Sequence, residues 1–202
     1  SRSLWFAQDR WKTNYKMPYF SEIIDDFLVK NLAYFNYESY AKRINLQGNE
    51  TVLEMGCGGG NLSKFIAKRV YFGKLICIDN SNYWIKKANN RLKQYKNIEF
   101  KVEDIRELEQ KEFDVAVVHY ILHDIPKKES VIKTLKTCLK EGGRIYIREP
   151  TRKSHGMPTQ EIKLLMLNQG FLEEKSRESY SFPLRGKVYE GIFRKQLSLN
   201  RW

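Results

Sequence analysis

The chain has 202 residues, of which 42% are hydrophobic and 13% aromatic, and this is enough for a single domain with a sizeable core. Its three cysteines, Cys57, Cys77 and Cys138, are far apart and form no CxxC pair, so neither a disulfide framework nor a metal site is predicted. No apolar run has the length of a membrane span or the position of a signal peptide. We therefore expect a soluble, cytoplasmic protein without a transmembrane segment.

The net charge of +12 is spread over lysines at helical spacing, such as Lys64, Lys68, Lys133 and Lys136. This distribution is typical of solvated helix surfaces. It also leaves open an attraction to an acidic substrate, to nucleic acid or to an anionic membrane surface.

The first fifty residues are rich in aromatic side chains and have a helical pattern. The stretch SEIIDDFLVKNLAYF begins with Ser21, a suitable helix cap, and carries acidic residues in its first turn. We expect residues 1–47 to form a helical extension that acts as a lid, with Tyr15, Tyr19 and Phe20 as its site-facing residues. The alternative is that these aromatic residues form an apolar stripe that docks on the rest of the domain.

From residue 48 to residue 202, short β-rich runs alternate with helical stretches. The runs are TVLEM, KLICID, IEFKV, FDVAVVHY and GRIYIREP. Such alternation predicts a parallel sheet with helices on both faces, and the unbroken apolar run VAVV favours a strand covered on both sides. Near the C-terminus a helix over about residues 158–168 should stop at Gly170, and two antiparallel strands should follow it at the sheet edge.

Four glycines lie in five positions of the run VLEMGCGGGNL, directly after the first strand. Glycines at the junction of a strand and a helix let bare backbone approach a ligand, with amide groups facing it. The dinucleotide pattern G-x-G-x-x-G fails in both registers, because Asn61 and Ser63 occupy the sixth positions, and no Gly-Lys-Ser/Thr follows. With dinucleotides and phosphate-loop ligands excluded, the ligand class that these glycines still favour is a nucleoside without phosphates.

Two acidic positions strengthen this interpretation. Asp79 ends the second strand, where a carboxylate can accept hydrogen bonds from both ribose hydroxyls. Asp104 and Ile105 follow the third strand, where a carboxylate and a backbone amide can contact an adenine edge.

These motifs resemble those of the class I S-adenosylmethionine-dependent methyltransferases over roughly residues 48–150. The first motif of that family matches Leu53 to Gly60, its later acidic positions match Asp79 and Asp104, and FDVAVVHYILHDI and LKEGGRIYIREP resemble its later motifs. The resemblance implies an α/β fold with a Rossmann-like, seven-stranded, mostly parallel sheet whose last strand is antiparallel. It also implies S-adenosylmethionine as cofactor and S-adenosylhomocysteine as product.

The predicted cofactor-binding residues are those that match these motifs: Glu54, Gly56, Cys57, Gly58, Gly60, Asp79, Asn80, Asp104, Ile105 and His119. Within this set, Glu54 orients the loop or meets the cofactor's ammonium through water, and Cys57 is a small apolar filler. For Asp79 the alternative is a helix cap, and for Asp104 it is a solvated acidic helix. His119 is expected to contribute its backbone carbonyl.

The candidate catalytic residues are His119, Tyr120 and His123, which follow the fourth strand. Histidine titrates near neutrality and can accept a proton from an acceptor atom, although each of these side chains can equally be a packed or capping residue. A sulfonium methyl is already activated, so alignment of the acceptor and exclusion of water supply much of the acceleration.

We expect the acceptor to be a small molecule. The segment HYILHDIP resembles a branch that includes quinone C-methylating and many small-molecule O- and N-methylating enzymes, and the motifs for base methylation are absent. The alternatives are an RNA or protein methyltransferase that uses the basic surface, or a catalytically silent cofactor-binding subunit. The sequence leaves the oligomeric state undetermined.

Overall fold

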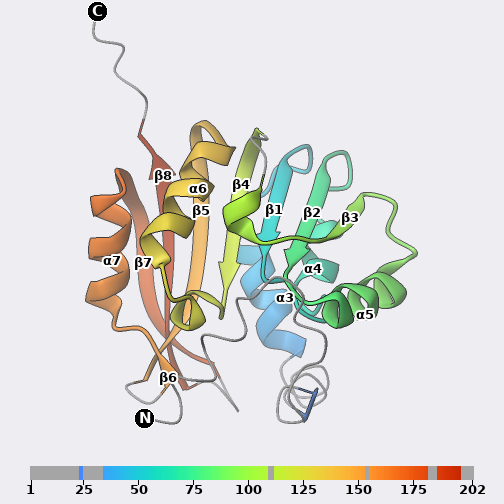
Figure 1. Ribbon diagram of the computed structural model, residues 1–202, viewed down its shortest axis with the longest axis horizontal. Helices are drawn as coiled ribbons and strands as arrows, with labels where there is room; N and C mark the ends of the chain where they lie inside the picture. The colour runs from blue at the N-terminus through green and yellow to red at the C-terminus, as the bar shows by residue number, and fades with distance from the viewer. Residues whose placement is uncertain (1–22, 25–33, 109–111, 153–154, 182–185, 197–202) are drawn as a thin grey trace, which may run out of the picture.

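The computed structural model describes residues 23–24, 34–108, 112–152, 155–181 and 186–196. Its centre is a sheet with the strand order β3-β2-β1-β4-β5-β8-β7, and the short strand β6 pairs with β5 off this path (Figure 1). The strands are β1 (Thr51–Met55), β2 (Lys74–Asp79), β3 (Ile98–Val102), β4 (Phe113–His119), β5 (Leu139–Arg152), β6 (His155–Gly156), β7 (Phe171–Ser181) and β8 (Gly186–Lys195). The strands β1 to β5 run parallel, whereas β8 is antiparallel to both β5 and β7. The Rossmann-like, mostly parallel sheet with an antiparallel C-terminal strand is therefore confirmed.

Helices cover both faces of this sheet (Figure 1). They are α3 (Tyr34–Arg43), α4 (Ser63–Ala67), α5 (Asn82–Leu92), α6 (Lys128–Cys138) and α7 (Thr159–Asn168), with the short 3-10 turns η1 (Ile105–Glu107) and η2 (Leu122–Asp124). Alternate residues of β1 show how one strand serves two cores, since Leu53 belongs to the core under α6 and α7 and Val52 to the core under α3 and α4. The run VAVV divides in the same way, as expected for a strand buried on both sides.

The C-terminal part follows the predicted order of helix, strand and strand. Gly170, directly after α7, has a φ of +74°, which is the left-handed conformation that commonly ends a helix. β8 lies between β5 and the edge strand β7, so the last strand of the chain is inserted into the sheet. One strand differs from the sequence prediction: β5 begins at Leu139, before the run GRIYIREP, and extends past Pro150 to Arg152.

The predicted extension over residues 1–47 is described only in part. Its α3 contributes Tyr40 and Ala41 to the core on one face of the sheet. The predicted lid residues Tyr15, Tyr19 and Phe20 lie outside the described residues, so their role stays a prediction. Within the described ranges, no helix combines the length and the apolar character that a bilayer crossing requires.

Candidate active site

The glycine-rich loop leaves β1 at the carboxyl edge of the sheet. Gly56, Gly58 and Gly60 have φ values of +68°, +51° and +76°, a region that side chains with a Cβ adopt only with strain. The amides of Gly56 and Cys57 both donate to the carbonyl of Ile78, at 2.8 and 3.2 Å, which ties the loop to β2. A Cβ on Gly58 would meet no atom within 4 Å, so the loop leaves open space at that residue.

Asp79, at the end of β2, joins the loop to the next helix. One carboxylate oxygen accepts a hydrogen bond from the Gly58 amide at 3.0 Å, and the other accepts one from the Ser81 amide at 2.9 Å. The helix cap itself is Ser81, whose hydroxyl accepts from the amide of Trp84. Asp79 is only half-buried, so its carboxylate retains acceptor capacity toward the neighbouring hollow.

The hollow is formed at the ends of β1, β2 and β3. Its lining residues are Met55, Gly56, Ile78, Asp79, Asn80, Glu103, Asp104, Ile105 and Ile121. Five of the predicted cofactor-binding residues, Gly56, Asp79, Asn80, Asp104 and Ile105, thus meet around one space. Ile121 closes it from the β4 side, because its side chain lies 2.8 Å from where a Cβ on Gly56 would stand.

Asp104 is buried and paired with Arg106. Its carboxylate accepts hydrogen bonds from the Arg106 amide and from the Arg106 Nε, both at 2.9 Å. Burial opposes ionisation of Asp104, but the hydrogen bonds from Arg106 outweigh it, so the pKa of Asp104 is lowered. A carboxylate held ionised beside the hollow favours a ligand with hydrogen-bond donors.

Glu54 lies beneath the loop rather than in the hollow. Its side chain points to the α3 and α4 side of the sheet, where the Cys77 thiol donates to Glu54 Oε2 at 3.5 Å. Burial is the main cause that raises the pKa of Glu54 to about 7, against a smaller lowering by the neighbouring side chains of Ser63 and Cys77. This placement fits a carboxylate that supports the loop.

The segment after β4 turns sharply at Tyr120. This residue has a φ of +57°, and its amide donates to the carbonyl of Arg148 on β5 at 2.8 Å. A bulky residue in the left-handed region is a strained conformation of the kind that clusters at functional sites. The His119 ring packs on the α3 side against Tyr37 and Tyr40, with ring centres 5.1 and 5.2 Å away.

His123 lies on the other side, in η2, and is held by a residue that the sequence analysis missed. The carboxylate of Glu149, fully buried near the end of β5, has its Oε2 2.5 Å from His123 Nδ1. Its Oε1 accepts the backbone amides of Ile121 and Leu122 at 2.8 and 2.7 Å. The sequence does contain a feature that points to Glu149: two charged residues, Arg148 and Glu149, directly follow the apolar run IYI of a buried strand.

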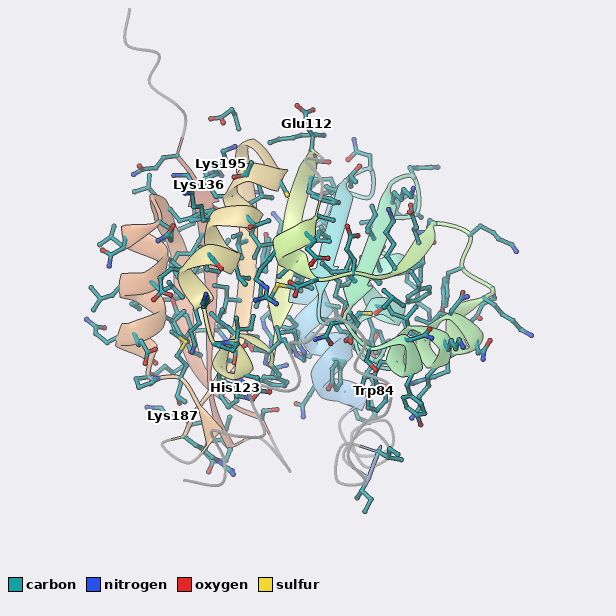
Figure 2. All side chains as sticks on the ribbon, in the orientation of Figure 1. Trp84, Glu112, His123, Lys136, Lys187 and Lys195 are labelled. Atoms are coloured by element: carbon teal, nitrogen blue, oxygen red, sulfur yellow. The ribbon has the colours of Figure 1, made fainter. Side chains whose placement is uncertain are left out.

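The predicted site residues that the structure describes lie at one edge of the sheet. Figure 2 shows His123 and Trp84 at the lower edge, where the parallel strands end, and Glu112, just before β4, at the opposite edge. Open α/β sheets bind ligands at this carboxyl edge. Left-handed glycines after the first strand and an acid after the second define a nucleoside-binding α/β domain.

Residues 46–181 match the family described as "Methyltransferase domain", and the chain belongs to that family. The chain thus carries a domain of the S-adenosylmethionine-dependent methyltransferase family, whose cofactor is S-adenosylmethionine. The open space at Gly58 and the acid-lined hollow fit such a group, which brings a sulfonium methyl but no phosphate.

The chain is similar to a ubiquinone biosynthesis O-methyltransferase from Coxiella burnetii, with 32% identity over 69% of this chain and 56% of the relative. It is also similar to the protein named "Putative methyltransferase 235L" of Invertebrate iridescent virus 6, with 30% identity over 58% of this chain and 43% of that protein. The chain thus spans about half the length of these two relatives.

A solved structure shows the same fold. The N-methyltransferase NodS from Bradyrhizobium japonicum, in complex with S-adenosyl-l-homocysteine, aligns with a TM-score of 0.70 over 96% of this chain and 99% of that chain. At 18% identity, this likeness shows the fold alone.

Proposed function

We propose that the protein transfers the methyl group of S-adenosylmethionine to a small-molecule acceptor held at the ends of β4 and β5. The observation that carries this proposal is the burial of the residues at that position. The side chains of His123 and Arg148 are only 4% and 3% exposed, and Glu149 is fully buried. Enclosed polar groups suit a compact acceptor better than a polymer, which needs an open basic surface.

The curated relative from Coxiella burnetii supports this proposal by its name, which is that of a ubiquinone biosynthesis O-methyltransferase. The name identifies that protein's acceptor as part of ubiquinone biosynthesis. For this chain it favours the small-molecule class.

We assign the cofactor to the hollow beside the glycine-rich loop. In this proposal the backbone of Gly56, Gly58 and Gly60 packs against the methionine part, and Asp79 accepts the ribose hydroxyls. Asn80, Asp104 and Ile105 would contact the adenine, while Glu54 and Cys57 support the loop from below. His119 would contribute its backbone carbonyl, because its ring is already packed between tyrosines of α3.

We assign the role of general base to His123 in preference to Tyr120 or the side chain of His119. Because Nδ1 faces the Glu149 carboxylate, the tautomer that we propose carries its proton on Nδ1 and uses Nε2 as the accepting atom. After the ring has taken up a proton, its positive charge lies between Glu149 at 2.5 Å and Asp124 at 3.6 Å. Two carboxylates then stabilise the cation, so His123 can hold the proton that leaves the acceptor.

The experiment is a search for the methylated product. Protein and S-adenosylmethionine with a labelled methyl group are incubated with a cell extract separated into small-molecule, RNA and protein fractions. We expect the label in the small-molecule fraction. Label in RNA or protein would overturn the proposed acceptor class, and tight binding of S-adenosylhomocysteine without any labelled fraction would indicate a catalytically silent subunit.

A further inference from the structure

Arg148 is a buried cation beside the proposed transfer site. It lies near the end of β5, where it is the register partner of His119 on β4. Its guanidinium stands over the rings of Tyr40 and Tyr120, 5.1 and 5.3 Å from their centres. Such stacking fixes the orientation of the guanidinium, and burial strengthens its interaction with any anion that reaches it.

The charges around Arg148 do not balance. Glu190 on β8, the register partner of Arg148, has its carboxylate 3.2 Å from Arg148 Nε. The same carboxylate also accepts from Arg43 of α3 at 2.7 and 2.9 Å and lies 3.2 Å from Arg177 on β7. Within the described part of the chain, three guanidinium groups therefore share one carboxylate. Arg43 and Arg177 are 30% and 47% exposed, whereas Arg148 is 3% exposed. Buried charge is costly unless it is paired, so Arg148, which shares its only carboxylate among the described residues with two competitors, favours a further anion.

Tyr40 supplies a second indication of a missing partner. Its hydroxyl is buried and has no hydrogen-bond partner among the residues that the structure describes. Burial is the main cause that raises the pKa of Tyr40 well above its ordinary value, so the hydroxyl keeps its proton and remains a donor. A buried donor without a partner is unfavourable, and an anionic oxygen would satisfy it.

The strained turn ties this group to the transfer site. The Tyr120 amide, in the left-handed conformation, donates to the Arg148 carbonyl, and the Tyr120 ring covers the Arg148 guanidinium. Ile121, the next residue, lines the hollow assigned to the cofactor. An anion on Arg148 would therefore lie beside the turn that carries Ile121, on the α3 side of the sheet edge at which we place the acceptor.

We propose that Arg148, together with the Tyr40 hydroxyl, binds an anionic oxygen group of the methyl acceptor, a carboxylate or a phosphate. The acceptor is then an acidic small molecule whose charged group is distinct from the atom that is methylated. This inference rests on the proposed function and makes it more specific.

The test uses calorimetry on the full chain saturated with S-adenosylhomocysteine, with benzoate, phenyl phosphate and the neutral analogue benzamide as probes. We expect one of the two anions to bind about ten-fold or more tightly than benzamide, because hydrogen bonds between charged groups are roughly twice as strong as neutral ones. A preference for benzoate assigns a carboxylate, and a preference for phenyl phosphate assigns a phosphate. Equal binding of all three probes, or no binding of any, overturns the proposal.

Two variants and a control identify the residue responsible. Arg148→Gln should abolish the preference for the anion, and Tyr40→Phe, which keeps the ring over Arg148, should reduce it by several-fold. The control is Arg144→Gln, which changes an arginine of the same strand that pairs with Glu174 instead of Glu190, and it should leave the preference unchanged. If Arg148→Gln does not fold, the test depends on Tyr40→Phe and on the preference of the wild-type protein for an anion over benzamide. An unchanged preference in Tyr40→Phe would show that the Tyr40 hydroxyl does not bind the anion.

The same titrations separate the two proposals. If the wild-type protein does not bind S-adenosylhomocysteine, the proposed function and its assigned cofactor site are contradicted. Retained binding with no anion preference would contradict only the role of Arg148. In the product search, the methylated molecule should be retained by an anion exchanger at neutral pH, and a product that is not retained would also overturn this inference.

Discussion

Glu149 Oε2 lies 2.5 Å from His123 Nδ1, and the other oxygen of the same carboxylate holds two consecutive backbone amides of the loop after β4. One buried acid thus fixes both the position of the loop and the orientation of the imidazole. Glu149 is not itself part of the lining of the proposed cofactor hollow, but it holds the backbone of Ile121, which is, so it acts as a positioning residue.

Replacement of Glu149 by glutamine should slow methyl transfer by about 100-fold, the scale of a general-base contribution. The amide keeps the shape of the side chain, but its NH₂ group would donate to Nδ1 and move the ring proton to Nε2, the atom that must accept. Nitrogen NMR of the His123 ring measures this directly: we expect the Nδ1–H tautomer in the wild-type protein and the Nε2–H tautomer in Glu149→Gln.

The control is Glu129→Gln, an exposed acid on α6. It should change neither the tautomer nor the rate. If the Glu149→Gln ring keeps its proton on Nδ1 and the rate stays within two-fold of wild type, His123 is not the base that Glu149 positions.

Asp79→Asn should weaken binding of S-adenosylhomocysteine by about 10- to 100-fold, since hydrogen bonds to a charged group contribute about 1.5–3 kcal/mol. The matched control is Asp114→Asn, near the opposite end of the sheet. Like Asp79, Asp114 accepts a backbone amide, that of Thr51 at 2.8 Å, and is half-buried. Calorimetry should show normal affinity for the control. Equal affinities of the two variants would mean that Asp79 only ties the loop to α5.

Two glycines of one loop should respond differently to alanine. Both substitutions place a Cβ in the left-handed region, which costs about 1–2 kcal/mol. On Gly60 the Cβ would also stand 2.9 Å from Leu92 Cδ1 and 3.2 Å from Ala88 Cβ, whereas on Gly58 it would meet open space. Gly60→Ala should therefore lower the free energy of unfolding by about 1–3 kcal/mol more than Gly58→Ala.

The expected order of the two variants is reversed for cofactor affinity: Gly58→Ala, the more stable variant, should be the one that binds the cofactor less tightly. Gly58→Ala fills space that we assign to the cofactor, so it should weaken S-adenosylhomocysteine binding while most of the stability remains. Denaturant unfolding and calorimetry on the same samples make this comparison. Wild-type affinity in Gly58→Ala would show that the cofactor does not occupy that space.

The sequence alone predicts the fold and the placement of the glycine-rich loop and Asp79 at the carboxyl edge of the sheet, for local reasons. Gly56, Gly58 and Gly60 adopt the left-handed conformations that only glycine takes without strain, and Asp79 ends its strand at the expected edge. These features depend on a few consecutive residues and on the direction of parallel strands. They can be inferred without knowledge of any long-range contact.

The contacts of Arg148 and Glu149 could not be predicted from the sequence, because they depend on the register of strands that are distant in the chain. Arg148 meets Glu190 since β8 is inserted beside β5, and the two residues are 42 positions apart in the chain. Glu149 meets His123 through a turn whose geometry follows from the strained Tyr120. Hydrophobic periodicity shows that a strand is buried, but it does not reveal which polar side chains of different strands meet.

Glu54 should make stability depend on pH in a defined direction. Because burial raises the pKa of Glu54 from 4.5 to about 7, the folded chain holds this proton over a range where the unfolded chain has lost it. The stabilisation is fully present below about pH 4.5 and is lost as the pH rises through about 7. The total change from this group is on the order of 3 kcal/mol, at about 1.4 kcal/mol for each pH unit of difference.

Glu54→Gln, which cannot ionise, should remove this dependence. In denaturant unfolding without cofactor, the variant should gain stability relative to wild type as the pH is raised from about 5 to about 8. The exposed variant Glu129→Gln serves as the control and should follow the wild-type curve. Parallel pH profiles of Glu54→Gln and wild type would mean that the Glu54 carboxyl ionises as readily in the folded chain as in the unfolded one, contrary to its burial under the loop.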